Sequence, residues 1–385
     1  MSLYLSGCQF LTHLGGIAVL YQGESSEEAK SARFASNFFL GVELMQQKKQ
    51  RSSFAVCPLR FFLIPFFAVC LFMQTAQGAE AQELIPVGKT VGVTLDTAGL
   101  LVLGTGSING EEAAVSKKAI QAGDRILQAN GEELENKEAF QEMIENSGGS
   151  SLTLLVERDG RQKQVSVTPV FSAVDNAYKI GVWVRDSIQG IGTVTYYDPK
   201  MKTFGALGHG VYDVDTGQLM AIREGALAKA ELTEIVRGAK GIAGELVGTV
   251  DLQEKIAEVE QNTETGIFGN VNGAPFAGEP LQVAELDEIR KGDAVLLSDL
   301  EGDGVKEYAV KIETIRRNGE KNHKDLTIRI TDERLLALTG GIVQGMSGSP
   351  IIQDGKLVGA VTYVLVNDPT RGYGIFIENM LDAAK

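Results

Sequence analysis

The sequence predicts a mainly β protein in which a small α+β part is followed by a longer region of barrels or sandwiches. This prediction rests on 45 glycines among 385 residues, on many short runs of Val, Ile and Leu, and on the turn residues that separate these runs. A chain of this length can form two or three domains. Its net charge of −14 argues against nucleic acid as a partner, because phosphate binding needs clustered Lys and Arg. We therefore expect a protein or peptide partner.

The N-terminal part carries the pattern of an export signal. A basic stretch at 48–51 precedes a charge-free apolar run at 61–73, and a small-x-small cleavage sequence follows at 79–81. The apolar run is shorter than the ~20 residues of a spanning helix and is typical of a signal peptide, with an uncleaved membrane anchor as an equal alternative. We assign residues 45–81 to this signal peptide or anchor. Residues 1–44 show no periodicity and are interpreted as a non-native or disordered extension that arose from a wrongly chosen start codon.

Residues 84–170 combine short strands with one helix. The runs at 91–95 and 99–103 are rich in Val and Leu and are bounded by turn residues, which is typical of strands. A helix is predicted from about 137 to 146. After it, a turn at Asp159-Gly160 closes the segment as a hairpin. The segment therefore forms the small α+β part of the predicted fold.

One run in this segment, AGDRILQANG at 122–131, resembles the core of PDZ domains, in which a buried strand leads to an Asn-Gly turn. The resemblance covers most of residues 84–170. It implies a groove beside the strand that contains Val91, Gly92 and Val93, where a peptide is bound as an additional strand. A small spacer domain without a ligand is the alternative.

Residues 171–385 are rich in glycine and in short strand patterns, which favours barrels or sandwiches. Near the end of this region, Ser347 lies in the sequence Gly-Met-Ser-Gly-Ser-Pro and is the candidate nucleophile. Gly345 and Gly348 allow the tight turn that a nucleophile needs, and the amides of Gly345 and Ser347 are the candidate oxyanion hole. An ordinary Gly/Ser loop is the alternative. Strands are predicted at 190–197, 203–207, 294–298, 308–315, 326–330 and 357–366.

A serine hydroxyl needs a neighbouring base, which is usually an imidazole. The chain has three histidines. His209 lies between two glycines at the end of a predicted strand, whereas His323 lies in a charged hairpin tip and His13 in the N-terminal extension. His209 is therefore the candidate base, and a structural turn residue is the alternative.

The third member of a catalytic triad is a carboxylate that orients the imidazole. Asp332 is our candidate, although it also stands where a helix begins and could serve that helix. Thr362, on a strand one hairpin after the nucleophile, is a candidate substrate contact. All cysteines lie at or before residue 70, and the sequence predicts no metal and no cofactor. Spacing leaves four other carboxylates open, namely Asp213, Asp215, Asp293 and Asp299.

The combination of an export signal, a PDZ-like segment, LGHGVYDVDTG around His209 and GMSGSPIIQDGKLVGAVTYVLVNDPTRGYGIFIENML resembles the stage IV sporulation protein B family of serine peptidases. The resemblance covers roughly residues 84–385. It implies a PDZ-like domain at 84–170, followed by a chymotrypsin-like double β-barrel serine peptidase domain at 171–385. It also implies that His209, Asp332 and Ser347 form the triad and that Thr362 lies near it.

The same resemblance implies a biological role. The enzyme is expected to cross the forespore membrane into the intermembrane space, where it is anchored or secreted. There it is expected to cleave itself and a membrane-bound regulatory protein, which releases a metalloprotease that activates a late mother-cell sigma factor. The alternatives are a PDZ scaffold with an inactive peptidase-like barrel and a general quality-control protease.

Overall fold

The protein is described by a computed structural model over residues 82–112, 119–272, 276–317 and 323–385. The predicted extension at 1–44 and the signal or anchor at 45–81 lie outside the described residues. The fold is mainly β, as predicted, with three short helices in the described ranges, α2 (Lys137–Asn146), α3 (Glu333–Thr339) and α4 (Ile377–Ala383). None of these helices has the length and apolar character needed to cross a membrane.

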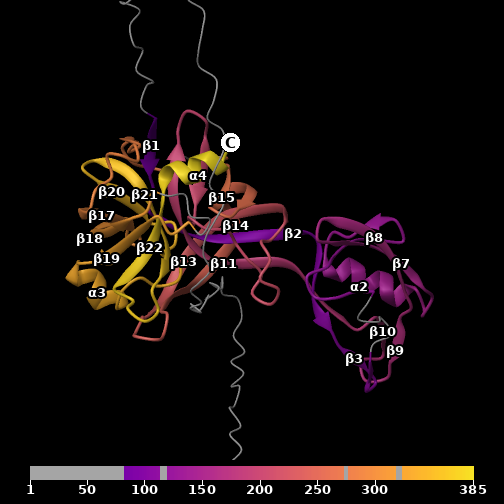
Figure 1. Ribbon diagram of the computed structural model, residues 1–385. Helices are drawn as coiled ribbons and strands as arrows, with labels where there is room; N and C mark the ends of the chain where they lie inside the picture. The colour runs from indigo at the N-terminus through magenta and orange to yellow at the C-terminus, as the bar shows by residue number, and fades with distance from the viewer. Residues whose placement is uncertain (1–81, 113–118, 273–275, 318–322) are drawn as a thin grey trace, which may run out of the picture. The chain divides into compact units, whose positions relative to one another are not determined.

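The C-terminal strands form a closed six-stranded antiparallel barrel, which Figure 1 shows in orange and yellow. In β18, Tyr308, Val310 and Ile312 are buried and alternate with exposed residues, so one face of the strand packs into the barrel core. The strands follow the order β17 (Gly292–Ser298), β18 (Lys306–Ile315), β19 (Leu326–Ile330), β22 (Arg371–Phe376), β21 (Lys356–Val364) and β20 (Pro350–Gln353).

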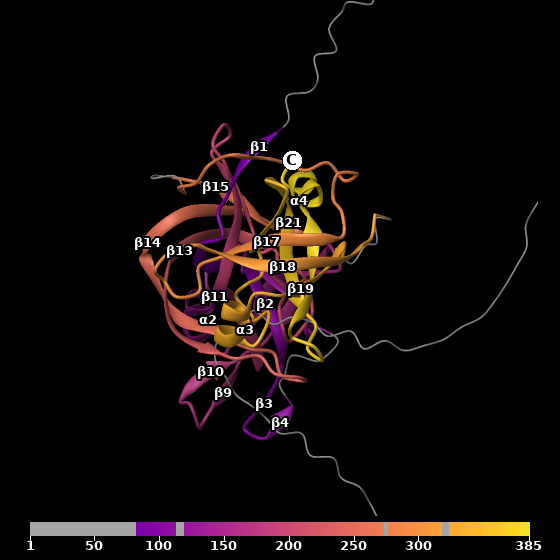
Figure 2. The same cartoon turned by 90° about the vertical axis from the view of Figure 1, so that its left-hand side faces the viewer.

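A second ring of six strands lies earlier in the chain. It closes because β11 pairs with β12 on one part of its length and with β2 on another, and β2 also pairs with β13. Two of its strands, β13 and β14, are long and strongly curved (Figure 2). The ring follows the order β2 (Thr90–Thr105), β11 (Val182–Asp198), β12 (Thr203–Ala206), β15 (Gly266–Asn270), β14 (Glu245–Thr263) and β13 (Ile222–Val236). Two short strands, β1 (Glu83–Pro86) and β16 (Leu281–Gln282), extend it from β11.

The remaining strands surround α2 and form the PDZ part. The helix has the bounds predicted from the sequence, and the Asn136 side chain caps it by accepting a hydrogen bond from the Ala139 amide (2.8 Å). The predicted hairpin turn is present too, with positive φ at both Asp159 (49°) and Gly160 (71°). The strands are β3 (Ser107–Ile108), β4 (Glu111–Glu112), β5 (Arg125–Ala129), β6 (Glu132–Glu133), β7 (Leu152–Arg158), β8 (Arg161–Val167), β9 (Val170–Ser172) and β10 (Ala177–Lys179).

Two long strands belong to both the PDZ part and the first barrel. Residues 182–185 of β11 pair with residues 101–105 of β2, and residues 187–193 pair with 90–96. Residues 91–97 of β2 also pair with β13. This part of β2, together with residues 187–193 of β11, is therefore part of the barrel. The predicted division at 170/171 consequently does not separate the domains in the structure, because residues 90–96 are a barrel strand that precedes the PDZ part.

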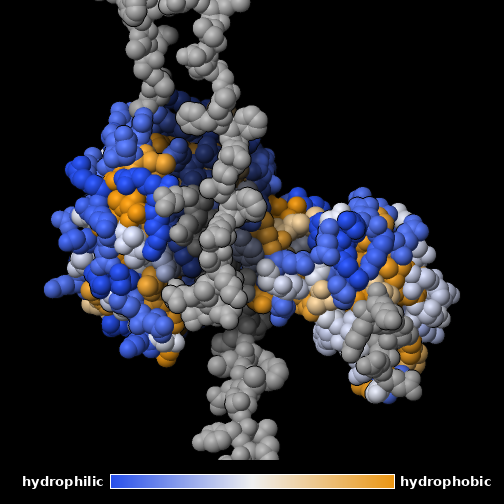
Figure 3. Space-filling model, in the orientation of Figure 1, coloured by the Kyte–Doolittle hydropathy of each residue, from blue (hydrophilic) through white to orange (hydrophobic). Residues whose placement is uncertain are grey.

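The face of the described residues shown in Figure 3 is largely hydrophilic, with apolar residues in separate groups between the polar ones. The large apolar side chains with the greatest exposure include Val174 (88 %) and Trp183 (70 %) of the PDZ part. Isolated exposed apolar residues are common, but neighbouring ones beside a cavity indicate a binding surface. Val174 and Trp183 both border one cavity of the PDZ part.

Candidate active site

The candidate nucleophile Ser347 lies on a turn between α3 and β20. Gly345 and Gly348 both have positive φ (96° and 94°), a conformation that L side chains rarely adopt. A Cβ at Gly348 would also overlap the Thr193 carbonyl oxygen and the Leu207 backbone. The structure therefore needs glycine at both positions, and the tight turn expected from the sequence is present.

The two amides predicted to form an oxyanion hole have no hydrogen-bond partner within the described chain. The N–H groups of Gly345 and Ser347 are free, whereas the amides next to them in the turn are bonded. The bonded amides are those of Gln344 (to the Gly244 oxygen, 2.8 Å), Met346 (to the Val343 oxygen, 3.2 Å) and Gly348 (to the Val361 oxygen, 2.8 Å). Two free donors two residues apart on one turn are the arrangement that can bind a developing oxyanion.

Backbone contacts fix the direction of these two amides. The Gln344 carbonyl accepts a hydrogen bond from the Leu246 amide (2.9 Å), and because a trans peptide points its C=O and N–H in opposite directions, the Gly345 N–H points away from β14. The Met346 carbonyl, which belongs to the same peptide as the Ser347 N–H, accepts a hydrogen bond from the Ser349 amide (3.0 Å). The Ser347 N–H therefore points away from the Ser349 amide. The directions of both candidate oxyanion donors are thus held by backbone hydrogen bonds.

The candidate base His209 lies in the loop that follows β12. Its side chain is 4 % exposed, and its Nδ1 lies 2.8 Å from the carbonyl oxygen of Gly210. A proton on Nδ1 satisfies this oxygen and leaves Nε2 free to accept a proton. The ring also stacks on Tyr363, with centroids 5.0 Å apart and an interplanar angle of 22°. Burial lowers the pKa of His209, and the hydrogen bond to Gly210 opposes this only in part, so the imidazole is neutral and basic at neutral pH.

The structure brings the His209 loop against the nucleophile turn and the neighbouring strand β21. A Cβ at Gly208 would lie 3.2 Å from the Thr362 methyl carbon and 3.2 Å from the Val361 oxygen. Thr362 is 3 % exposed, and its hydroxyl has no hydrogen-bond partner in the described part of the chain. The predicted substrate contact is therefore a buried residue packed against the His209 loop.

The structure does not bring Asp332 to His209. Asp332 is the N-cap of α3, where it accepts hydrogen bonds from the amides of Arg334 (2.9 Å) and Leu335 (3.4 Å), and its Oδ2 accepts one from the Ala309 amide (3.2 Å). The Arg334 side chain, followed by these amides, holds the pKa of this carboxyl well below its usual range. The contacts of Asp332 are thus those of a residue that begins a helix, which was the alternative. No described carboxylate bonds to the His209 imidazole.

Asp213, one of the two candidate carboxylates close to His209 in sequence, has partners of its own. Asp213 is fully buried and forms an ion pair with Arg185, while its second oxygen accepts bonds from the Asp215 amide (3.1 Å) and the Thr216 amide (2.8 Å). These contacts explain its burial without any role at the imidazole. Among the described residues, the candidate site therefore consists of Ser347 with the two free amides and of His209, with no carboxylate bonded to the imidazole.

We expect Asp332→Asn to keep turnover within about threefold of wild type, because asparagine caps helices as well as aspartate does. Asp332→Ala should lower the free energy of unfolding by about 1–2 kcal/mol, the usual range for a lost cap. Turnover and thermal unfolding of both variants check this. A fall in turnover of about 10⁴-fold in Asp332→Asn, with unchanged unfolding, would instead restore Asp332 to the triad.

The predicted peptide groove has to be placed elsewhere in the PDZ part. Val91, Gly92 and Val93 pair with β11 on one side and with β13 on the other, so this strand has no free edge for a peptide. Residues 182–189 of β11, by contrast, pair only with β2 among the described strands. The free edge that a bound peptide needs is therefore at the start of β11.

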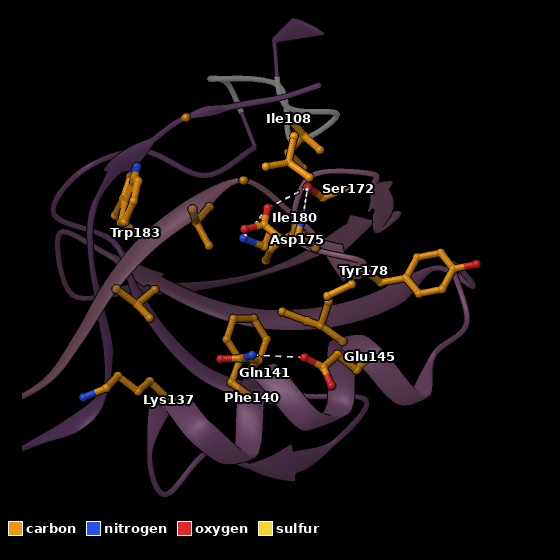
Figure 4. Close-up of a pocket in the computed structure, with 18 of the residues that line it drawn as sticks. Ile108, Lys137, Phe140, Gln141, Glu145, Ser172, Asp175, Tyr178, Ile180 and Trp183 are labelled. Atoms are coloured by element: carbon orange, nitrogen blue, oxygen red, sulfur yellow. Dashed lines mark hydrogen bonds and ion pairs between the residues drawn. The ribbon is translucent and has the colours of Figure 1, made fainter. Parts of the chain in front are cut away.

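A cavity of about 700 Å³ lies beside this edge. Figure 4 shows α2 on one side of it, with Phe140 and Gln141, and Ile180 and Trp183 from the segment around the start of β11. The segment turns into the strand at Gly181, whose φ is 71°. The sequence signal for this edge is the turn Ile180-Gly181-Val182 directly before a strand, which the sequence analysis did not use.

Together, two antiparallel β-barrels, a serine on a glycine turn with two free amides, and a buried histidine whose loop packs against that turn define a chymotrypsin-like serine peptidase, here with a PDZ domain. The chain belongs to the SpoIVB peptidase S55 family, whose model matches residues 176–381. A PDZ domain model matches residues 109–158. The sequence interpretation of fold, family and enzyme class is thereby confirmed.

Solved structures with a related fold are distant from this chain. The Rv3671c protease from M. tuberculosis in its active form is 18% identical, with 50% of this chain and 71% of that chain covered and a TM-score of 0.30. The HtrA-type protease AlgW with a decapeptide is 10% identical over 78% of this chain and 64% of that one (TM-score 0.31). The PDZ domain of an SdrC-like protein from Listeria monocytogenes is 16% identical over 23% and 87% (TM-score 0.20). No curated protein matches the chain.

Proposed function

We propose that this peptidase is an exported serine endopeptidase of sporulation that cleaves itself and a membrane-bound regulatory protein. Cleavage of that regulator would free a sigma-factor-processing metalloprotease and so activate a late mother-cell sigma factor. The family to which the chain belongs supports the sporulation role. The observation that carries the catalytic part is the pair of free amides at Gly345 and Ser347 beside the His209 loop.

The proposed reaction follows from these residues. The Ser347 hydroxyl oxygen attacks the carbonyl carbon of the scissile peptide while Nε2 of His209 takes its proton. The amides of Gly345 and Ser347 donate to the oxyanion. When the C–N bond breaks, His209 returns the proton to the leaving amine, and water then hydrolyses the acyl-enzyme with the same base. Hydrogen bonds between base and nucleophile are often long in a free enzyme and shorten with substrate.

The test is to incubate the purified full-length protein and its Ser347→Ala variant. We expect self-cleavage and labelling by a fluorophosphonate in the wild type, and neither in the variant. N-terminal sequencing of each fragment then gives the cleavage preference. Identical behaviour of the two proteins would favour the scaffold with an inactive barrel, and degradation of many unfolded proteins would favour a quality-control protease.

The location and the target are tested in cells. We propose that the protein crosses the forespore membrane and acts in the intermembrane space, as an anchored or a secreted enzyme. Fractionation of sporulating cells should find it with that space or with the membrane. Co-expression with the membrane-bound regulator of the metalloprotease should give a regulator fragment that is absent with Ser347→Ala. An intact regulator in the presence of active enzyme would exclude it as the target.

We further infer that the PDZ domain binds a peptide in the cavity between α2 and the start of β11. PDZ domains bind peptides as an additional strand on a free sheet edge, and residues 182–189 have one. Apolar side chains line the cavity, including the buried Phe140, Ile144 and Ile180 and the exposed Trp183. The groove therefore suits an extended peptide with apolar side chains.

Trp183 is the single tryptophan of the chain, so its fluorescence reports on this groove. Gln141→Phe places a large side chain in the groove from the exposed face of α2 and should weaken peptide binding at least tenfold, with little effect on unfolding. Titration with a library of apolar peptides, followed by Trp183 emission, measures this. Glu142→Phe, on the same helix but outside the cavity, is the control. Equal binding by both variants would place the ligand elsewhere.

A further inference from the structure

Thr193 of β11 is the residue of the first barrel whose side chain bonds to the nucleophile turn. Its side chain is fully buried. Its Oγ1 donates a hydrogen bond to the Gly345 carbonyl oxygen (2.8 Å), and its amide donates one to the Ser347 carbonyl oxygen (3.1 Å). Its own carbonyl accepts a bond from the Leu207 amide (3.1 Å), two residues before His209. One residue thus contacts both oxyanion-hole residues and the chain that leads to the base.

We propose that the Thr193 hydroxyl is a positioning group for the oxyanion hole. Gly345 has a positive φ and no side chain, so nothing in its own structure prevents rotation of the peptides on either side of it. The Gln344 carbonyl, bound by the Leu246 amide, fixes the peptide before it. The peptide after it is held at both ends, at the Gly345 oxygen by the Thr193 hydroxyl and at the Met346 amide by the Val343 oxygen (3.2 Å). Both torsions of Gly345 are then set, and its N–H stays directed at the oxyanion.

The effect of the hydroxyl can be measured separately, because every other described hydrogen bond to residues 344–348 comes from backbone atoms. Thr193→Val removes the oxygen at almost unchanged volume and keeps both backbone bonds. It also leaves the buried Gly345 carbonyl without its partner, so the turn can lower its energy by rotating the Gly345–Met346 peptide, which shifts the Ser347 amide relative to the Gly345 amide. The effect should therefore appear in the transition state, which uses both amides, more than in substrate binding.

The proposal rests on the serine peptidase activity, which the Ser347→Ala comparison establishes independently. We expect Thr193→Val to lower kcat and the fluorophosphonate labelling rate about 10- to 100-fold with KM within about twofold, less than the ~10²–10³ for deletion of an oxyanion donor. Thr193→Ser, which keeps the hydroxyl, should recover most of the rate. Thr195→Val is the matched control, because Thr195 is a buried threonine of the same strand whose hydroxyl has no described partner.

Two outcomes would overturn the proposal. One is a Thr193→Val enzyme with wild-type kcat and labelling rate. The other is a loss of rate in Thr193→Val that is also seen in Thr193→Ser or in Thr195→Val. In either case the loss would come from packing of β11 and not from the missing hydroxyl. Thermal unfolding of all three variants separates a misplaced turn from a poorly folded protein. If the Ser347→Ala and wild-type proteins are both inactive, the failure belongs to the proposed function and not to Thr193.

Discussion

His209→Gln should reduce fluorophosphonate labelling and peptide hydrolysis by about 10⁴- to 10⁶-fold, the range for loss of a catalytic base. Glutamine can replace the Nδ1–H bond to Gly210 but cannot take the Ser347 proton. His323→Gln is the matched control, because His323 is the other described histidine and its Nε2 pairs with Glu264 (3.5 Å). Comparable losses in both variants would show that His209 is not the specific base.

The pH dependence of the wild type tests the same residue. The base must be neutral, so activity is lost as pH falls through the pKa of His209. Burial lowers this pKa below the usual ~6.5 of a free imidazole, and the acid limb of kcat/KM should therefore lie below pH 6.5. Labelling rates between pH 4 and 9 give this limb directly. A limb above pH 6.5 would mean that the imidazole is stabilised as a cation, against the effect of its burial, which outweighs that of the Gly210 hydrogen bond.

Local signals in the sequence predicted the helix and the turns well. The bounds of α2 follow from the Asn136 cap and the spacing of Phe140 and Ile144, which are all contained in a dozen residues. The turn at Ser347 follows from Gly345 and Gly348 for the same reason, since the need for positive φ is a local property. The strand that contains Val91, Gly92 and Val93 was predicted as well, although its partners were not.

The partners were missed because strand pairing is a long-range property. The alternation of buried residues in β2 is the same whether its neighbour is a PDZ strand or a barrel strand, and its partners on β11 and β13 come about a hundred residues later. The chain forms a barrel strand with the first part of β2, then forms the PDZ part, and then returns to the barrel along β11. A division at one position in the sequence cannot describe this order. The peptide groove was for this reason predicted beside a barrel strand and not beside the free edge of β11.

The carboxylate is the opposite case, because local contacts explain Asp332 while its triad role stays a prediction. The residues that follow Asp332 form the helix that the sequence predicts, and the N-cap contacts confirm the local alternative. The triad assignment came from resemblance, and the distance of 15 positions to Ser347 in sequence contains no information about distance to His209. In the described structure, Nδ1 of His209 is hydrogen-bonded to the Gly210 carbonyl oxygen. This is the ring atom to which a triad carboxylate would bind. Orientation of the base by its own loop and by Tyr363 stacking is consistent with these contacts.

Gly348→Ala should abolish activity and destabilise the fold. At φ 94° any Cβ is strained, which alone costs about 1–2 kcal/mol, and here the Cβ would also overlap the Thr193 oxygen and the Leu207 backbone. These are the atoms that join the nucleophile turn to the chain before His209, so relief of the overlap must separate the two. We expect labelling below about 1 % of wild type and a lower unfolding temperature.

Gly355→Ala is the control that separates strain from overlap. Gly355 also has a positive φ (75°), in the turn between β20 and β21, but no atom lies within 4 Å of its Cβ position. It should lose about 1 kcal/mol of stability and keep its labelling rate. If Gly348→Ala is labelled as fast as Gly355→Ala, the contact between the nucleophile turn and Thr193 is not required for catalysis. A selective loss in Gly348→Ala would show that the two barrels must meet at this glycine for Ser347 to react.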